Sequence, residues 1–562
     1  MNYTADFETT TDINDCRVWA WGVCDIANPS TFIYGNDIES FLNFMMDSDN
    51  STFYFHNLKF DGEFIIHHLL NNGYTHILDR KDAKNKTFTT LISDMGAFYS
   101  IKIYFKCGSR KVTATIYDSL KILPFSVDEI AKGFKLPISK LKIDYHEKRE
   151  KGHELTEMEV DYLRNDVEIV ARALSTLFEQ NLKQMTQGSN ALFDYKNTIT
   201  KKKFEYTFPI LKPDVDHSIR QSYKGGFTYL SPRYKNKEVG KGIVLDVNSL
   251  YPSVMYYEKL PFGDPVFFKG EYKHDELYPL YVICFRCNFE LKKNHIPTLQ
   301  LKNNRSFIPT EYVTSSNGED ILLTLTSVDY ELMKDHYNLY NVEYIGGWKF
   351  KSTDTMFKEY IDKWSSVKIN SKKEGNHAMY ILAKLMLNAL YGKFALNPNV
   401  RSKIPYLNDD NIVKYRNGEP ETRDGIYIPV GTFVTAYARN KTIRSAQKCF
   451  DRFIYADTDS LHLEGLDVPE GLEVHDTKLG AWKLESTFDK ARFIRQKCYL
   501  EINYNNCDCN FLTVTCAGMP SNVKKCVSWD NFKEGAVFHG KKLPVHTKGG
   551  IILKDYDFTI KI

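Results

Sequence analysis

The sequence lacks any apolar run of 18 or more residues, and its first ten residues (MNYTADFETT) contain no basic segment followed by an apolar one. These absences predict a chain without a membrane-spanning helix or a signal peptide. Its 11 cysteines are an odd number scattered through apolar segments, which favours reduced thiols over a disulfide framework. We therefore expect a soluble, unexported protein that works in a reducing cytoplasm.

Two short cysteine pairs, Cys284/Cys287 and Cys507/Cys509, have spacings that suggest zinc ligands. No second pair of cysteines or histidines accompanies the first, which also lies in an alternating run, YVICFRCNFEL, typical of a β-strand. The sequence therefore favours strand residues over zinc ligands.

Charge and composition exclude little by themselves. The net charge is only +3, from 74 basic and 71 acidic residues, but local clusters of opposite sign can cancel in such a sum. A hydrophobic share of 43% and an aromatic share of 14% exclude disorder on a large scale. A chain of 562 residues is long enough for about four domains.

Hydrophobic periodicity divides the chain into segments of different character. Residues 1 to about 120 predict short strands and turns, with one helix near 61–71. Thr156 and Glu159 form a capping box, and the apolar stripe after them predicts a helix that continues past 175. The polar stretch 184–203 indicates a first domain boundary. Further along we expect strands over 242–350, two helices within 355–394 separated at 370–376, a polar excursion after Pro398, a helix over about 432–450, a β-hairpin centred on Asp457, and a basic, strand-like end.

Four carboxylates of the N-terminal region lie on a predicted strand, loop and helix. Asp6 and Glu8 stand two apart on the strand, so both side chains project from one face. Asp61 follows a second strand, and Asp166 lies one turn after Tyr162 on the capped helix. Each acid alone is more typical of a solvated surface. Together they could hold two Mg²⁺ ions, the pair that phosphodiester hydrolysis uses to activate water and to stabilise the leaving oxygen.

A second set of carboxylates lies in the other half of the chain. Asp246 ends an apolar run that predicts a buried strand, and Asp457 and Asp459 lie between two apolar strands, near a hairpin tip. A strand end followed by a tight polar turn can present carboxylates to metal and backbone amides to phosphates. On the helix between these segments, Lys384 and Asn388 begin a polar stripe that Tyr391 completes.

These patterns resemble known motifs. Asp-x-Glu at 6–8, Asn-x-x-x-Asp at 57–61 and Tyr-x-x-x-Asp at 162–166 resemble the exonuclease motifs of DnaQ-like proofreading domains. The segments DVNSLYP, KLMLNALYG and YADTDS resemble motifs A, B and C of family B DNA polymerases. Three further segments resemble polymerase elements that bind DNA: Tyr-x-Gly-Gly at 223–226, Thr-x-x-Gly/Ala-Arg at 435–439 and Lys-x-Tyr at 497–499.

The resemblance is closest to the protein-primed branch of family B, the bacteriophage replicases of the phi-twenty-nine type. The segment IYDSL at 116–120, and Lys140 followed by Tyr145, resemble elements of that branch. The chain is also short for family B, and two insertions interrupt its palm. The implied fold class is α+β and multidomain, a DnaQ-like (RNase H-like) α/β exonuclease domain before a right-hand polymerase. The implied domains are exonuclease 1–186, palm 187–257 and 428–515, insertions 258–360 and 396–427, fingers 361–395 and thumb 516–562.

The resemblance also assigns roles to residues. It implies catalysis of synthesis by Asp246, Asp457, Asp459 and Lys384, and of 3′→5′ hydrolysis by Asp6, Glu8, Asp61, Asp166, Tyr162 and Lys140. The implied metal ligands are these seven carboxylates together with Val247. Nucleotide contacts fall on Tyr251, Lys368, Lys384, Asn388 and Tyr391, with Tyr251 excluding a 2′-hydroxyl. DNA contacts fall on Thr9, His56, Asn57, Phe60, Ser119, Leu120, Tyr145, Tyr223, Gly225, Gly226, Thr435, Arg439, Lys497 and Tyr499.

The expected function is therefore replication of viral DNA in the host cytoplasm by a monomeric polymerase with proofreading. The resemblance implies two Mg²⁺ ions at each site, with Mn²⁺ as a substitute. Its implied partners are primer–template DNA, single-stranded DNA, deoxynucleoside triphosphates and a terminal protein that acts as primer. The first insertion would contact that protein, and the second would couple synthesis to strand displacement.

Three other interpretations fit parts of the sequence. A nuclease whose polymerase half has decayed is disfavoured by the intact catalytic aspartates and lysines. A palm enzyme that copies or makes RNA is disfavoured by Tyr251 and by the proofreading motifs. A structural nucleic-acid binder would not need two sets of carboxylates, which repel phosphate unless metal is bound.

Overall fold

The N-terminal domain is built around an eight-stranded mixed sheet. The computed structural model describes residues 1–562 apart from 49, 109–110, 146, 301–311, 505–509 and 562. Strand β1 (Asn2–Thr9) is antiparallel to β2 (Val18–Asp25) and parallel to β4 (Ser51–Phe55). The sheet order is β3-β2-β1-β4-β8-β7-β6-β5. The remaining strands are β3 (Phe32–Gly35), β5 (Thr75–His76), β6 (Thr87–Ile92), β7 (Phe98–Lys106) and β8 (Val112–Asp118).

Alternation along β1 sends its side chains into two different layers. Ala5 and Phe7 pack with α1 (Ile38–Asp47) and α2 (Leu58–Asn71) in one hydrophobic cluster. On the opposite face, Thr4 Oγ1 donates to the carbonyl of Val167, 2.8 Å away on α4 (Glu157–Glu179). The predicted capping box is confirmed at the start of α4. This layering places the even-numbered side chains of β1 under α4.

The palm is a five-stranded antiparallel sheet in the order β20-β11-β19-β18-β9. Its core is packed by α8 (Leu250–Tyr257) and α12 (Ile428–Lys448), which share one large hydrophobic cluster with the sheet. The predicted hairpin around Asp457 is confirmed, since β18 and β19 flank it. The strands are β20 (Trp482–Phe488), β11 (Gly242–Val247), β19 (Ser460–Glu464), β18 (Phe453–Asp457) and β9 (Thr228–Leu230).

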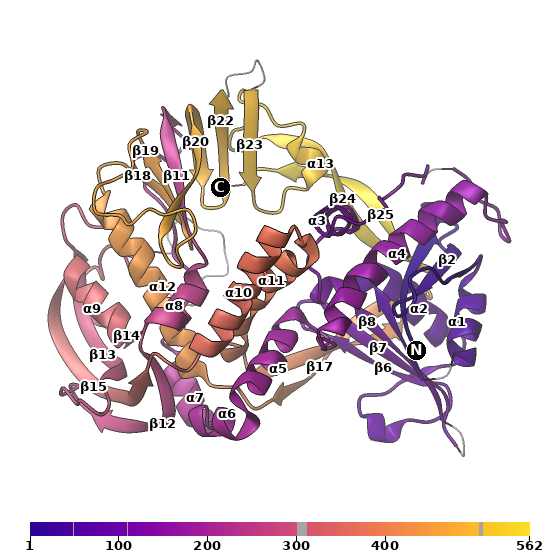
Figure 1. The fold of residues 1–562 in the computed structure, drawn as a ribbon, viewed down its shortest axis with the longest axis horizontal. Helices are drawn as coiled ribbons and strands as arrows, with labels where there is room; N and C mark the ends of the chain where they lie inside the picture. Colours follow the sequence, from indigo (N-terminus) through magenta and orange to yellow (C-terminus); the bar gives the residue numbers. More distant parts are fainter. Residues whose placement is uncertain (49, 109–110, 146, 301–311, 505–509, 562) are drawn as a thin grey trace.

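Two helices and a separate sheet lie beside the palm (Figure 1). The antiparallel helices α10 (Lys358–Glu374) and α11 (His377–Phe394) stand between the palm and the N-terminal domain in this view. The sheet β12-β15-β13-β14, with α9 (Ser327–His336) against it, lies within the segment predicted as the first insertion. Its strands are β12 (Leu260–Lys269), β13 (Leu280–Leu291), β14 (Ile321–Thr326) and β15 (Tyr337–Thr353).

A fourth sheet and two hairpins complete the described part of the chain. The sheet order is β10-β21-β22-β23, and a short helix, α13 (Ser521–Lys524), follows it. The hairpin β24–β25 extends from this region toward the N-terminal domain (Figure 1). The elements are β10 (Glu238–Val239), β21 (Lys490–Arg495), β22 (Cys498–Tyr504), β23 (Asn510–Cys516), β24 (Val537–Thr547), β25 (Gly550–Thr559), β16 (Asn399–Leu407) and β17 (Val413–Thr422).

The hairpins β16–β17 and β24–β25 meet on helix α2. These three segments, far apart in sequence, together form a ring of contacts. Gly549 N–H donates to His67 Nε2 at 3.1 Å, and the same ring nitrogen lies 3.1 Å from the carbonyl of Asn411. Tyr415 OH donates to Glu63 Oε2 at 2.8 Å. Ile551 is buried in the same cluster as α2.

Several predicted boundaries differ from the structure. The stretch 184–203 is largely the helix α5 (Gln187–Ile199) and the start of α6 (Lys201–Thr207), because Ala191, Tyr195 and Ile199 form a buried stripe among its polar residues. The polar run 370–376 lies mostly inside α10, which ends at Gly375 with φ at 70°. The polar excursion after Pro398 is the hairpin β16–β17. One hydrophobic cluster spans the boundary predicted at 515/516.

The structure describes one of the two cysteine pairs. The strand predicted around Cys284 and Cys287 is confirmed as β13, which pairs with β14 and β15. Cys507 and Cys509 lie outside the described residues. Within the described part of the chain, no helix is both long enough and apolar enough to cross a membrane.

Candidate active sites

The first site lies where β1, α2 and α4 meet. Asp6 and Glu8 lie on the face of β1 that α4 covers, Asp61 lies in the first turn of α2, and Asp166 lies on α4. Glu8 is 6% exposed, and Asp61 and Asp166 are each 4% exposed. The structure therefore brings the four predicted carboxylates together, although Asp61 belongs to a helix rather than to a loop.

Burial and mutual repulsion raise the pKa values of these carboxyl groups. Burial, and then the charge of Asp166, raise the pKa of Asp6 to about 7. Burial, and then the charge of Asp6, hold the pKa values of Glu8 and Asp61 well above their ordinary ranges. A cluster of this kind has an excess of negative charge, which a bound divalent cation would offset.

Lys140 and two tyrosines border this cluster. Lys140 Nζ lies 2.6 Å from Asp166 Oδ2, whereas Asp166 Oδ1 is buried and has no hydrogen-bond partner among the described residues. The hydroxyls of Tyr145 and Tyr162 are 2.6 Å apart. Burial, and then the charges of Glu8 and Asp166, raise the pKa of Tyr162, so its hydroxyl stays protonated and can orient water. Tyr145 is 48% exposed and faces the approach to the cluster.

The predicted single-strand contacts surround a buried aspartate that sequence reasoning did not select. Asp118 Oδ1 accepts hydrogen bonds from the N–H groups of Asn57 and Leu120, each 3.0 Å away. His56 Nδ1 lies 2.9 Å from Ser119 Oγ. Ser119 is fully buried and donates to the carbonyl of Phe55, and its DNA contact stays a prediction. Thr9 and Phe60 are half-buried near these elements.

The second site lies on the palm sheet. Asp246 is the penultimate residue of β11, opposite residue 460 of β19 and residue 483 of β20. The N–H of Val247 donates to the carbonyl of Asp459 at 2.8 Å, which joins the strand end to the hairpin turn. Burial, and then the charges of Asp459 and Glu485, raise the pKa of Asp246 to about 7. Burial also raises the pKa of Asp459.

Asp457 faces the primer-binding segment predicted at 497–499. Lys497 Nζ lies 2.8 Å and 2.7 Å from its two carboxylate oxygens. Tyr455 OH donates to Asp457 Oδ2 at 3.2 Å and accepts from the N–H of Lys497 at 2.9 Å. Thr228 Oγ1 also donates to Asp457, at 3.0 Å. Lys497 thus holds Asp457, while the charge of Asp459 acts on Asp246.

The predicted nucleotide contacts lie on α8, α10 and α11. The rings of Tyr251 and Tyr391 are stacked, with centroids 3.9 Å apart. Lys384 and Asn388 are exposed on α11, as the polar stripe predicted. Burial, and then the charges of Lys384, Lys372 and Lys483, lower the pKa of Lys368. These lysines concentrate positive charge where a triphosphate could bind.

The loop before β9 packs tightly on the catalytic hairpin. A Cβ on Gly226 would lie 2.5 Å from Thr458 Oγ1, so this contact requires glycine, whereas a Cβ on Gly225 would meet nothing within 4 Å. Tyr223 is half-buried beside them.

Two predicted DNA contacts, Thr435 and Arg439, lie behind this loop. Arg439 donates to the carbonyls of Lys224 and Gly225 at 2.7 Å and 2.8 Å, and forms an ion pair with Asp329. Thr435 Oγ1 donates to backbone carbonyls of its own helix. Both side chains are buried, at 1% exposure for Thr435 and 3% for Arg439, and Arg439 holds the loop through its backbone carbonyls, so their DNA contacts stay predictions.

The donor sets fit divalent cations at both sites. Carboxylate oxygens are the ligands that Mg²⁺ and Mn²⁺ prefer, and the carboxyls in each site have raised pKa values. Across the described residues, no three histidine, cysteine, aspartate or glutamate side chains yet converge as a metal-binding group does. Lys140 and Lys497 instead engage Asp166 and Asp457.

Three charged residues near these sites escaped sequence reasoning. Glu485 and Lys483 are exposed on β20 and act electrostatically on Asp246. The sequence of this charged strand does not indicate that they lie near a site, because only the pairing of β20 with β11 brings them there. Asp118 lies within the segment IYDSL, and its position at the end of an apolar strand could have identified it.

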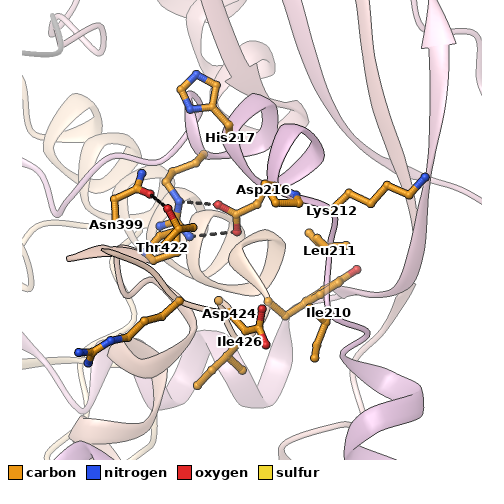
Figure 2. A pocket seen from close by; sticks show the side chains of 15 residues that line it. Ile210, Leu211, Lys212, Asp216, His217, Asn399, Thr422, Asp424 and Ile426 are labelled. Carbon is orange, nitrogen blue, oxygen red and sulfur yellow. Dashed lines mark hydrogen bonds and ion pairs between the residues drawn. The ribbon is translucent and has the colours of Figure 1, made fainter. Parts of the chain in front are cut away.

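Two cavities lie away from the carboxylates. One, of about 350 Å³, lies where α7 (Pro213–Arg220) meets the base of the hairpin β16–β17 (Figure 2). Arg220 forms an ion pair with Asp216 at 2.8 Å there, and Thr422 donates to Asn399 at 3.0 Å. The other, of about 670 Å³, lies between β6, α5 and β16. Its basic lining residues are Lys121, Lys393, Arg401 and Arg423.

The fold and the two carboxylate sites define a right-hand polymerase that follows a DnaQ-like exonuclease domain. The family model "DNA polymerase type B, organellar and viral" matches residues 42–151 and 142–477. The chain belongs to this family, as a DNA-directed DNA polymerase of the phi29 type.

Individual relatives agree over the full length of the chain. The DNA polymerase of Bacillus phage Nf is 48% identical over 575 residues, covering 100% of this chain and 99% of the relative. That of Streptococcus phage Cp-1 is 33% identical over 582 residues, with 100% and 98% covered. The solved structure of the phi29 DNA polymerase complexed with primer-template DNA and incoming nucleotide substrates has a TM-score of 0.93 and 47% identity, covering both chains completely.

Proposed function

We propose that this DNA polymerase replicates viral DNA from a terminal-protein primer, proofreads with its N-terminal domain and displaces the strand ahead of it. The observation that carries the proposal is the presence of two separate carboxylate clusters in one chain, each with a lysine against one aspartate. A polymerase without proofreading would need only one of these clusters. When bound, two Mg²⁺ or Mn²⁺ ions at each site supply activation of the attacking oxygen and stabilisation of the leaving one.

For synthesis, Asp246 and Asp459 would hold the metal pair, with the carbonyl of Val247 and the carboxylate of Asp457 beside them. Lys384 and Lys368 would bind the triphosphate, since they supply mobile positive charge where charge builds up on pyrophosphate. Tyr251, stacked on Tyr391, would lie under the sugar and reject a 2′-hydroxyl. Asn388 would line the nascent base pair, and Lys497 with Tyr499 would grip the primer strand.

For proofreading, the frayed 3′ end would enter the N-terminal cluster. Asp6, Glu8, Asp61 and Asp166 would hold the metal pair there, Tyr162 would orient the attacking water, and Lys140 would contact the scissile phosphate. The exposed ring of Tyr145 borders the same approach. Thr9, His56, Asn57, Phe60 and Leu120 would bind the single strand.

The template path is supported by the ring of contacts among α2, β16–β17 and β24–β25. A template strand could pass through the basic cavity beside β16 while duplex product stays encircled. The loop at Tyr223, Gly225 and Gly226, held by Arg439 and Thr435, would guide DNA between the two sites. Such a ring would let one monomer work processively and open the duplex without other proteins.

Protein priming rests on the insertion β12–β15, which forms its own sheet beside the palm. A terminal protein seated on it would present a hydroxyl to the synthesis site in place of a primer 3′-hydroxyl. The nine described cysteines are all free thiols, which supports action in the reducing host cytoplasm.

A labelled primer–template incubated with the purified protein and Mg²⁺ tests the proposal. We expect extension when deoxynucleotides are present and 3′ shortening when they are withheld. Shortening under both conditions would leave only the nuclease. Extension without shortening would remove the proofreading role of the N-terminal cluster.

A further inference from the structure

Behind the palm sheet, four rings form a small core that it shares with the sheet β10-β21-β22-β23. Tyr455 and His462 contribute from β18 and β19, and Phe493 and Tyr499 from β21 and β22. The ring centroids are 5.3 Å apart for Tyr455 and His462, 5.0 Å for His462 and Tyr499, and 5.1 Å for Phe493 and Tyr499. We call these four residues the ring cluster.

A histidine–glutamate pair is buried at this junction. His462 Nδ1 lies 2.7 Å from Glu501 Oε1, and the two side chains are 2% and 10% exposed. His462 belongs to the palm sheet and Glu501 to β22, so the contact joins two sheets. A buried polar pair adds little net stability over apolar packing but is costly to break.

Two strands of this junction, β19 and β22, begin directly after a turn that carries site residues. Strand β19 starts immediately after Asp459, and β22 starts immediately after Lys497, whose φ is 54°. Lys497 contacts both oxygens of Asp457, and its N–H donates to Tyr455 OH. Tyr455 OH in turn donates to Asp457. Within the ring cluster, Tyr455 is therefore separated by one residue from Asp457 of the hairpin. Tyr499 is likewise separated by one residue from Lys497 in the second turn.

We propose that His462 and Glu501 are positioning residues for nucleotide addition. Their hydrogen bond sets the spacing between the hairpin of Asp457 and Asp459 and the turn of Lys497. The pair touches neither DNA nor nucleotide, and it acts through the ring cluster and Tyr455. The inference rests on the proposed role of Lys497 at the primer strand.

Three variants of the full-length protein separate positioning from stability. Glu501→Gln keeps an acceptor for His462, whereas Glu501→Leu removes it. The double variant His462→Phe/Glu501→Leu leaves no unpaired buried polar group and keeps an aromatic ring in the cluster. The control is Glu464→Leu, on the same strand as His462 and two residues farther from the catalytic turn, where an exposed carboxylate accepts from Tyr234.

The measurements are single-nucleotide addition to a primer–template, shortening of single-stranded DNA and the melting temperature. We expect Glu501→Leu to lower the maximal rate of addition by about tenfold, since sub-ångström misplacement of reacting groups has effects of this size. The KM for nucleotide and the shortening rate should stay within about twofold. Glu501→Gln should recover the rate to within about threefold, and the control should match the wild type. The double variant should melt like the wild type and remain slow.

A double variant that regains the wild-type rate together with its melting temperature would overturn the inference, because the pair would then serve stability alone. A parallel fall of synthesis, shortening and melting temperature in Glu501→Leu, without rescue by Glu501→Gln, would also overturn it. If the wild type does not shorten single-stranded DNA, the proofreading proposal fails separately, and the pair is judged on synthesis and melting.

Discussion

Lys140 Nζ lies 2.6 Å from Asp166 Oδ2 in the N-terminal domain. The palm repeats this relationship, with Lys497 Nζ 2.7 Å from Asp457 Oδ2. In each site a lysine offsets the charge of one carboxylate, while the neighbouring carboxyls have raised pKa values. Each site is thus partly neutralised by the chain itself, and a cation bound there would supply the rest.

The two sites should be separable by single substitutions. Asp459→Ala should reduce primer extension on the order of 10³-fold or more. It should leave 3′ shortening unchanged, because Asp459 directly precedes β19 of the palm and is not part of the N-terminal cluster. Asp166→Ala should do the reverse. Extension and shortening assays on one labelled primer–template check both, with melting curves as the control for folding. Loss of both activities from either folded variant would contradict the assignment of two sites.

Cation binding should depend on pH. The pKa values of Asp6 and Asp246 are raised to about 7, so both carboxyls become protonated as the pH falls below 7 and compete less well for metal. Mg²⁺ or Mn²⁺ should raise the melting temperature clearly at pH 8 and little at pH 5.5, with a gain of about 2.7 kcal/mol when the free ion is at 100 times its Kd. Chelation should reverse the gain. An equal gain at both pH values would show that other groups bind the cation.

Helix α2 contains the buried carboxyl group of Glu63. We expect its ionisation at high pH to weaken the contacts between α2 and the hairpins β16–β17 and β24–β25. Burial raises the pKa of Glu63 from 4.5 to about 7, although the hydrogen bond from Tyr415 and the charge of Lys59 oppose the shift. His546 Nδ1 also faces it, at 3.5 Å, and burial followed by Lys414 and Lys59 lowers the pKa of His546. The folded protein therefore keeps a proton that the unfolded chain releases between pH 4.5 and 7. The free energy of unfolding falls across that window and stays lower above it.

Glu63→Gln should remove this loss. We expect the variant to gain at most about 3 kcal/mol over the wild type at pH 8 and almost nothing near pH 4.5. Denaturant unfolding at the two pH values measures the difference. A gain of the same size at both would mean that the effect comes from packing rather than from the proton.

The tight contact between Gly226 and Thr458 gives a matched pair of substitutions. Gly226→Ala should lower the free energy of unfolding by about 1–3 kcal/mol, because its Cβ would lie 2.5 Å from Thr458 Oγ1. Gly225→Ala should leave it nearly unchanged, since a Cβ there meets nothing within 4 Å. Thermal or denaturant unfolding of both variants checks the contrast. Equal losses would show that backbone freedom, and not the close approach, explains the glycines.

Local patterns predicted much of this protein. The capping box at Thr156, the hairpin at Asp457 and the polar stripe of α11 depend on residues close together in sequence, and each is confirmed. Local patterns do not predict helix α5, because its buried residues pack against segments that are distant in sequence. Its polar residues alone are typical of a linker.

The sequence by itself determined which carboxylates to select as candidates, since Asp6, Glu8, Asp61 and Asp166, like Asp246 and Asp459, stand in short motifs that need no tertiary information. Only the tertiary structure decided what surrounds them. Strand pairing brought Glu485 to Asp246, and burial gave Ser119, Thr435 and Arg439 hydrogen bonds to the backbone carbonyls of the chain itself. The ring through Glu63, Tyr415 and Gly549 likewise joins residues hundreds of positions apart. Motifs reflect the chemistry of neighbouring residues, whereas burial and pairing depend on which distant segments the folded core brings together.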